Sequence, residues 1–143
     1  MSTPIIVETQ VNAPASVVWK ALTDKDQMKE WYFSLEAFEP IPGFEFKFTG
    51  GTDEHEYLHI CTIRESVPEA RLTHTWTYEN VPVETIVTWE LTATNNNSTT
   101  VKLTHAGVDD FPADNKDFAR ENFVAGWNEI VKISLKEYVE EKR

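Results

Sequence analysis

Apolar and polar residues alternate over much of the chain, and this pattern predicts β-strands. In Phe44–Phe48 three Phe fall on one face, and in Val87–Ala93 the apolar residues again share a face. The predicted strands are Ile5–Val11, Phe44–Phe48, Tyr57–Arg64, Leu72–Tyr78, Val87–Ala93 and Val101–His105. Turn-forming residues separate the later strands, at Gly50-Gly51, Asn80–Pro82 and Asn95–Ser98. We therefore expect sequential strands to pair as an antiparallel meander.

Helical spacing of apolar residues occurs near both ends of the chain. Pro14 suits the start of a first short helix, and Asp24 begins a second one that runs through Trp31. A longer helix is expected from Asp114, as its N-cap, to about Glu140. Its buried stripe is predicted at Phe123, Trp127, Ile130, Val131, Ser134 and Tyr138. Phe118 is out of phase with this stripe, so the first turn is expected to pack separately.

The predicted order of elements is a strand, two short helices, a six-stranded meander and a long helix. The apolar face of such a sheet must be covered by another element, and the long helix is the element large enough to cover it. The chain is therefore expected to form one α+β domain over residues 1–143, with a curved antiparallel sheet wrapped around the C-terminal helix. Bulky aromatic residues on both elements favour a cavity between them.

Composition limits the classes of partner. The 143 residues carry a formal net charge of −11, which repels phosphate backbones and anionic membranes, so nucleic acid is excluded. No apolar stretch approaches the roughly 20 residues of a membrane span, so membrane insertion is not expected. Cys61 is a lone thiol, which suits a reducing compartment, and a cytoplasmic location is expected.

Several short motifs follow one another in an order that resembles a known family. They are Pro14–Asp24, Trp31, Pro68, Arg71-Leu72, Thr75-Trp76, Thr99–Val101, Leu103–Gly107 and Gly126-Trp127. Together they resemble the family related to the C-terminal domain of the activator of the heat-shock protein 90 ATPase. That family belongs to the START-related (SRPBCC) helix-grip superfamily. The resemblance implies a sheet that wraps the last helix around an apolar tunnel, and ligand binding more often than catalysis.

The segment His55–His59 matches H-E-x-x-H, a zinc-protease motif that requires a helix. Here it leads into a strand pattern, where four residues span roughly 13 Å. Zinc bonds of about 2 Å cannot bridge that distance, so we expect no metal and no cofactor.

Two histidines are in phase with apolar neighbours on predicted strands, which places them on the inner face of the sheet. His74 and His105 are each interpreted first as a hydrogen-bonded core histidine, then as a polar contact to a ligand, and last as a general base. A buried Tyr138 hydroxyl would also need a partner, from protein, water or ligand. The predicted cavity lining is Trp31, Phe46, Phe48, Leu72, His74, Trp76, Trp89, Leu103, His105, Phe123, Trp127, Ile130, Val131, Ser134 and Tyr138.

Three functions follow from this sequence. The first is binding of an apolar small molecule. The second is interaction with a chaperone, as a modulator of its ATPase or in a stress response. The third is an enzyme of the cyclase or hydrolase kind, which needs a titratable pair inside the cavity. No interior carboxylate can be placed beside His74 and His105, so binding is favoured over catalysis.

Overall fold

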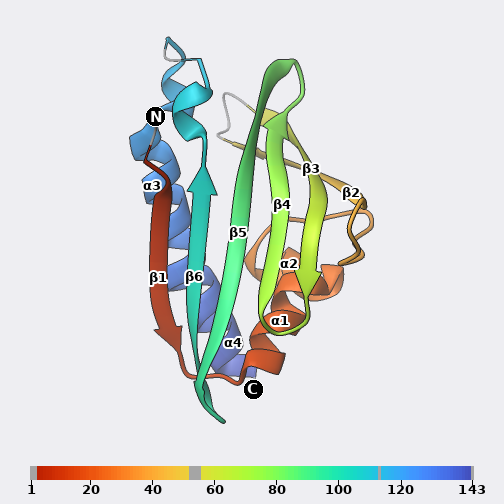
Figure 1. The fold of residues 1–143 in the computed structure, drawn as a ribbon, viewed down its shortest axis with the longest axis vertical. Coiled ribbons are helices and arrows are strands. Elements are labelled where there is room, and N and C mark those ends of the chain that lie inside the picture. Colours follow the sequence, from red (N-terminus) through yellow and green to blue (C-terminus); the bar gives the residue numbers. More distant parts are fainter. Residues whose placement is uncertain (1–2, 52–55, 113, 143) are drawn as a thin grey trace.

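A computed structural model describes residues 3–51, 56–112 and 114–142 (Figure 1). Six antiparallel strands form one sheet in the order β1-β6-β5-β4-β3-β2. They are β1 (Ile5–Val11), β2 (Glu45–Gly51), β3 (Glu56–Val67), β4 (Arg71–Tyr78), β5 (Val81–Asn95) and β6 (Ser98–Ala106). The meander is confirmed, but the expected six strands after the short helices were one too many. Five follow them within the described ranges, and β1 completes the sheet by pairing with β6.

The sheet is curved because its strands do not pair in perfect register. Register shifts lie between Ile63 and Glu65 in β3, between Trp76 and Tyr78 in β4, and near the end of β5. Such irregularities bend a strand and increase its twist. The curvature creates a concave face that the helices occupy.

Two short helices follow β1, as the sequence predicts: α1 (Ala15–Thr23) and α2 (Lys25–Trp31). Asp24 separates them, and its Oδ1 accepts a hydrogen bond from the Asp26 amide at 3.0 Å. In α1, Val18, Ala21 and Leu22 are buried. The two helices lie at one end of the sheet (Figure 1). Each helix in the described part of the chain is too short or too polar to cross a membrane.

The long C-terminal helix is confirmed, but it starts later than predicted. Two 3-10 turns come first, η1 (Val108–Asp110) and η2 (Lys116–Phe118), and Asp114 is not a helix cap. Asn115 caps the η2 turn instead, because its Oδ1 accepts from the Asp117 amide at 2.9 Å. Phe118 packs against Phe111 and Tyr78 and not in the helix stripe, as expected. The segment is still joined to the stripe, because Phe111 stacks on Phe123 at 5.5 Å.

The helix has three parts, α3 (Arg120–Asn128), the π-helical η3 (Glu129–Leu135) and α4 (Lys136–Lys142). Its fully covered side chains recur at every fourth residue: Phe123, Trp127, Val131, Leu135 and Val139. A π turn is wider than the 3.6-residue α turn, so the stripe stays aligned at a spacing of four. Ile130, Ser134 and Tyr138 were predicted in the buried stripe, but they lie at its edge and are only partly buried, with Ile130 and Tyr138 packed against the core.

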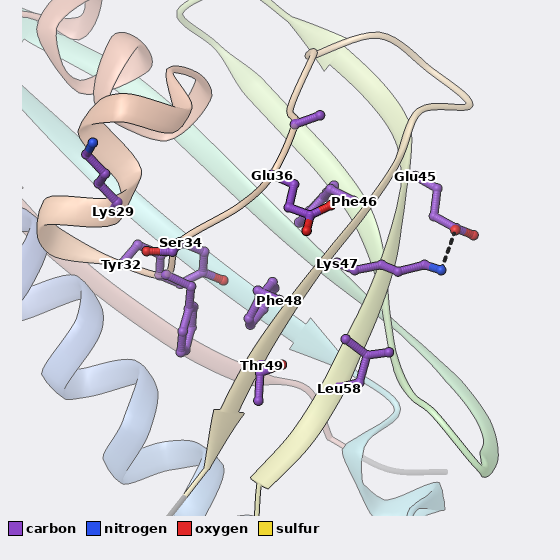
Figure 2. A pocket seen from close by; sticks show the side chains of 12 residues that line it. Lys29, Tyr32, Ser34, Glu36, Glu45, Phe46, Lys47, Phe48, Thr49 and Leu58 are labelled. Atoms are coloured by element: carbon purple, nitrogen blue, oxygen red, sulfur yellow. Dashed lines mark ion pairs between the residues drawn. The ribbon is translucent and has the colours of Figure 1, made fainter.

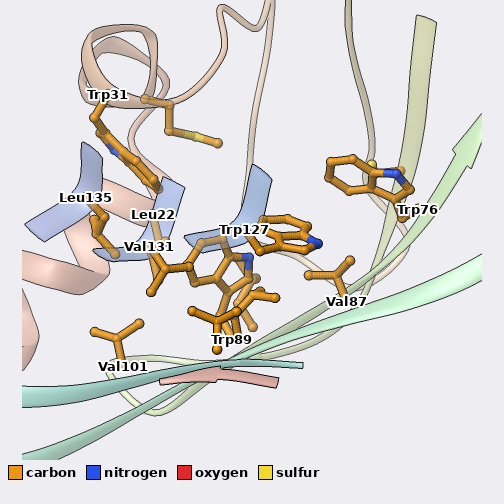
Figure 3. Close-up of a cluster of buried hydrophobic side chains, with 14 of the residues drawn as sticks. Leu22, Trp31, Trp76, Val87, Trp89, Val101, Trp127, Val131 and Leu135 are labelled. Atoms are coloured by element: carbon orange, nitrogen blue, oxygen red, sulfur yellow. The ribbon is translucent and has the colours of Figure 1, made fainter. Parts of the chain in front are cut away.

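The hydrophobic core has two halves. In one half the helix packs on the sheet, and the Trp127 ring lies 5.2 Å from Trp76 and 5.8 Å from Trp89 (Figure 3). The other half lies over β2. There the segment 32–44, which follows α2, places Phe33 and Phe38 against β2.

Candidate functional site

The segment 32–44 and strand β2 meet through aromatic side chains. Phe33 stacks on Phe48 with ring centroids 4.3 Å apart, and Phe38 meets Phe46 edge-on at 5.0 Å. Gly50 makes the first contact possible, because a β-carbon there would lie only 2.9 Å from the Phe33 ring. The alternation in β2 sends Phe46 and Phe48 inward. Aromatic side chains of an irregular segment, rather than a helix or a further strand, thus cover this part of the core.

An open groove of about 690 Å³ lies between this segment and the β2–β3 hairpin (Figure 2). Its lining is mixed, with apolar Phe33, Phe46, Phe48 and Leu58 beside charged residues. Phe46 and Phe48 point inward and are almost fully buried, whereas Leu58 pairs with Thr49 on the outer face of the hairpin. The charged residues are Lys29, Glu36, Glu45 and Lys47, of which Glu45 and Lys47 form an ion pair of 3.6 Å. The groove is large enough for a small molecule, since such sites measure about 300–1,000 Å³.

Next to the groove lies a small interior space of about 10 Å³, enough for about one water molecule. It is lined by Leu22, Met28, Trp31, Tyr32, Phe38, Phe46, Leu72, His74 and Trp89. Tyr32 and Phe46 line both spaces, so these two side chains separate the groove from the interior. The large sheet-to-helix cavity expected from the sequence is therefore not seen at this position, and side chains fill the interior.

Tyr32 is the unusual residue of this boundary. Its ring contacts Trp31 at 5.0 Å, Phe33 at 4.6 Å, Phe48 at 5.8 Å and Trp89 at 6.4 Å. Its hydroxyl oxygen is buried, and within the described residues it has no hydrogen-bond partner. Burial raises the pKa of the Tyr32 hydroxyl well above its ordinary value, so the group keeps its proton and can donate.

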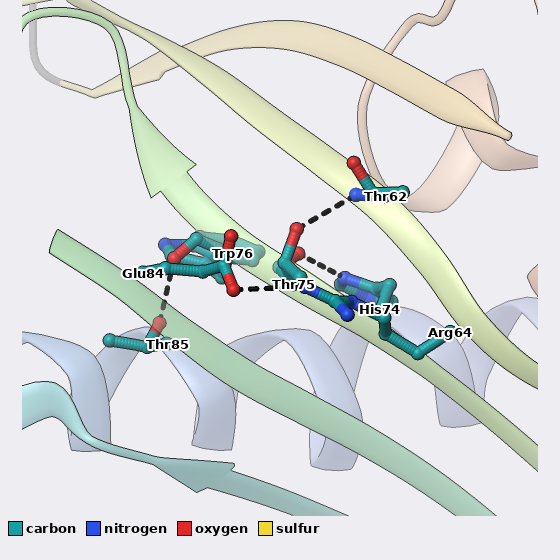
Figure 4. A network of polar contacts seen from close by, with 7 residues as sticks. All are labelled: Thr62, Arg64, His74, Thr75, Trp76, Glu84 and Thr85. Carbon is teal, nitrogen blue, oxygen red and sulfur yellow. Dashed lines mark hydrogen bonds and ion pairs between the residues drawn. The ribbon is translucent and has the colours of Figure 1, made fainter. Parts of the chain in front are cut away.

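His74 lies deep in the same half of the core. Its Nδ1–H donates to the Thr75 carbonyl at 2.8 Å, and the Thr75 hydroxyl accepts from the Thr62 amide (Figure 4). Burial lowers the pKa of His74 to about 4, so the ring is neutral at physiological pH. With Nδ1 protonated, Nε2 is the acceptor atom of this ring.

His105 is held by protein at both ring nitrogens. Trp127 Nε1–H donates to Nδ1 at 3.0 Å, so Nε2 carries the proton and donates to Thr85 Oγ1 at 2.7 Å. The Thr85 hydroxyl in turn donates to the Trp76 carbonyl at 2.8 Å (Figure 4). Burial lowers the pKa of His105 to about 3. The geometry favours the core-histidine interpretation over contact with a ligand.

The interior near Tyr32 disfavours charge of either sign. Burial lowers the pKa of His59 to about 4, and it raises the pKa of the Cys61 thiol and of the Tyr78 hydroxyl. Cys61 is completely buried, so its thiol is inert. A charged group is therefore disfavoured in this interior, and the charged residues that line the groove lie at its rim.

The structure divides the residues predicted as cavity lining into three sets. Trp31, Phe46, Phe48, Leu72, His74 and Trp89 lie at the groove or at the interior space beside it. Trp76, Leu103, His105, Phe123, Trp127 and Val131 are buried, in or beside the half covered by the helix. Ile130, Ser134 and Tyr138 lie on the flanks of the helix.

Sequence reasoning missed Tyr32, Phe33 and Phe38. The first two follow Trp31 directly, and the aromatic triplet was an available signal. They lie in an irregular segment, where neither period 2 nor period 3.6 applies. The sequence pattern therefore could not predict whether these side chains point inward or outward.

The H-E-x-x-H motif is not helical where it is described. Glu56–His59 belongs to β3, and His55 lies outside the described residues. Over the described ranges, no group of three or more His, Cys, Asp or Glu side chains is arranged to hold a metal.

A curved six-stranded antiparallel sheet, two short helices after β1 and a long C-terminal helix define a helix-grip domain of the START-related (SRPBCC) class. The family described as activator of Hsp90 ATPase homolog 1-like protein matches residues 12–140. The chain therefore belongs to this family, and the resemblance inferred from its motifs is confirmed.

Solved structures share the fold at low identity. A protein from Mesorhizobium loti, MLL2253, is 22% identical with a TM-score of 0.77, and the match covers 99% of both chains. The Aha1 dimer from Colwellia psychrerythraea is 20% identical with a TM-score of 0.72, over 97% of both chains. DynU16, from the dynemicin biosynthetic locus, is 24% identical with a TM-score of 0.77. That match covers 98% of this chain but 48% of DynU16. No curated protein matches the sequence.

Proposed function

We propose that the protein binds an apolar small molecule in the groove between segment 32–44 and the β2–β3 hairpin. The ligand reaches past Tyr32 and Phe46 toward the interior, beside Trp31 and Trp89. From the predicted lining, Trp31, Phe46, Phe48, Leu72, His74 and Trp89 are retained for this site. The binding of hydrophobic ligands by other members of the family supports the proposal.

One observation carries the proposal. A groove of about 690 Å³, lined in part by Phe33, Phe46 and Phe48, is also lined by Tyr32, whose buried hydroxyl lacks a protein partner among the described residues. Buried polar groups are nearly always hydrogen-bonded, and an exception on a residue that lines a groove favours a ligand site. The interior itself is packed, so binding requires the Tyr32 or Phe46 ring to move aside.

The test is a titration with N-phenyl-1-naphthylamine, an uncharged dye whose fluorescence rises in apolar surroundings. In the variant Ala37→Trp, a bulky ring is added at an exposed position of the groove wall. We expect this variant to bind the dye at least about tenfold more weakly, a loss of about 1.4 kcal/mol.

Ala125→Trp is the matched control, because Ala125 is also exposed but lies on α3, outside the groove lining. It should bind the dye like the natural protein. If Ala37→Trp and Ala125→Trp bind equally well, or if the natural protein does not bind the dye, the groove is not the site.

A second candidate function rests on the family match. Its description names activation of the Hsp90 ATPase, so we also propose interaction with a chaperone of that class in the cytoplasm. The ATPase rate of purified Hsp90 should then rise on addition of the protein. An unchanged rate over a range of protein concentrations would remove this candidate without affecting ligand binding.

A further inference from the structure

We propose that the molecule bound beside Tyr32 is an uncharged apolar compound with a carbonyl or ether oxygen, to which the Tyr32 hydroxyl donates a hydrogen bond. This inference rests on the ligand-binding function proposed above and narrows the class of ligand. It makes Tyr32 the residue that selects among apolar molecules of similar size.

The position of the Tyr32 hydroxyl favours a ligand that carries an oxygen atom. Four rings, those of Trp31, Phe33, Phe48 and Trp89, surround the Tyr32 ring, and its oxygen is buried without a partner in the described part of the protein. A buried hydroxyl without a hydrogen bond costs roughly 1–3 kcal/mol. Phenylalanine could make the same ring contacts without this cost. An oxygen on the ligand would remove it.

The described polar side chains near Tyr32 do not accept a hydrogen bond from its hydroxyl. Tyr78 is close enough to influence the Tyr32 hydroxyl, but the Tyr78 oxygen already accepts from Trp76 Nε1 at 2.9 Å. Cys61, the other polar neighbour, is a buried thiol, which is a weak acceptor. His74, whose Nε2 is an acceptor, lines the same small interior space as Tyr32, but no hydrogen bond joins the two side chains. Among the described residues the Tyr32 hydroxyl therefore meets no acceptor, whereas a carbonyl or ether oxygen of a ligand would be one.

The electrostatic environment of Tyr32 favours an uncharged ligand. Burial disfavours the anionic forms of Tyr32, Cys61 and Tyr78 and also the cationic forms of His59 and His74. A carboxylate or an ammonium group placed there would meet the same penalty. The charges at the rim balance, with two lysines and two glutamates, so they favour neither sign.

The experiment compares two compounds of nearly the same shape, 2-acetylnaphthalene and 2-isopropylnaphthalene. They differ in an oxygen that replaces a methyl group. Each displaces N-phenyl-1-naphthylamine from the natural protein and from Tyr32→Phe, with Tyr138→Phe as the matched control on the flank of the helix. Comparing the two proteins for each compound cancels the difference in hydrophobicity between the compounds.

We expect Tyr32→Phe to weaken binding of the acetyl compound by about three- to tenfold and to change binding of the isopropyl compound by less than about twofold. Tyr138→Phe should change neither. Equal effects of Tyr32→Phe on both compounds would overturn the inference while the binding function stands. Failure of both compounds to bind the natural protein would contradict the binding function as well.

A second readout uses no ligand. Because the Tyr32 hydroxyl lacks a partner among residues 3–51, 56–112 and 114–142, the ligand-free Tyr32→Phe variant should unfold at the same urea concentration as the natural protein or at a higher one. A clear loss of stability would show that the hydroxyl is already satisfied, and it would overturn the inference independently.

Discussion

At the scale of single residues, His105 is the side chain with the most constrained bonding. Trp127 donates to one ring nitrogen, and the other donates to Thr85, which donates to the Trp76 carbonyl. The chain of bonds fixes the neutral tautomer and ties the helix to β4, β5 and β6. Its direction follows from Trp127, which can only donate.

Trp127→Phe tests this chain, because it keeps an aromatic ring but removes the donor. The Nδ1 atom of His105 would remain buried and unpaired, and we expect a loss of at least about 2 kcal/mol in the free energy of unfolding. Urea denaturation measures it. Trp19→Phe, at a half-buried position in α1, is the control and should change stability by less than about 0.5 kcal/mol. Similar losses in both variants would contradict the role of the chain.

The sequence placed His74 and His105 on the inner face correctly, because strand alternation fixes which face a residue takes. It could not choose between core and ligand contact for either histidine. That choice depends on Trp127, 22 residues from His105, and on the register of β5 against β6. Tyr32 was missed for a different reason, because its segment has no periodicity.

At the scale of elements, the π segment η3 decides which residues of the C-terminal helix face the sheet. Regular α periodicity predicts Ser134 and Tyr138, whereas the structure buries Leu135 and Val139. The existence of the helix was predictable from its apolar spacing. The insertion of a wider turn was not, because nothing in the residue pattern marks a π segment.

Leu135→Ala tests the observed register. Leu135 is fully buried, so its truncation should lower the free energy of unfolding by about 2–5 kcal/mol. Ile133→Ala is the matched control, because Ile133 is 47% exposed, and it should cost less than about 1 kcal/mol. Thermal or urea unfolding of the two variants gives the comparison. Equal losses would show that the helix does not present the stripe described.

At the scale of the whole molecule, the three buried histidines link stability to pH. His59, His74 and His105 have pKa values of about 4, 4 and 3, below the ordinary 6.5 that applies in the unfolded chain. Between these values the unfolded state binds protons that the folded state does not. Stability is therefore fully present above about pH 6.5 and falls as the pH decreases toward 4.

We expect the free energy of unfolding to fall by roughly 1 kcal/mol or more for each histidine between about pH 7 and pH 5.5. Urea denaturation at the two values measures the change above the range in which ordinary carboxylates titrate. In His74→Gln, whose side-chain amide can still donate to the Thr75 carbonyl, the dependence should shrink by about a third. Equal stability at both pH values would contradict the buried, neutral state of the histidines.

The fold of the whole molecule was predictable, because alternating strands, two short helices and a long helix leave few arrangements of one sheet. The place of the candidate site was not. The sequence favoured a cavity under the C-terminal helix, where Trp127 fills the space against Trp76 and Trp89. The open groove lies instead beside the irregular segment 32–44, whose course depends on the packing of Phe33 and Phe38 on β2.

Binding of an apolar molecule beside Tyr32, between segment 32–44 and β2, is the proposal on which the function depends. Titration of the isotopically labelled protein with 2-acetylnaphthalene, followed by amide chemical shifts, tests it most directly. We expect shifts that saturate and concentrate at residues 32–37 and 45–49, with the amides of the outer helix face near Val124 and Ile133 unchanged. Shifts confined to other surfaces, or no saturable shifts at all, would contradict it.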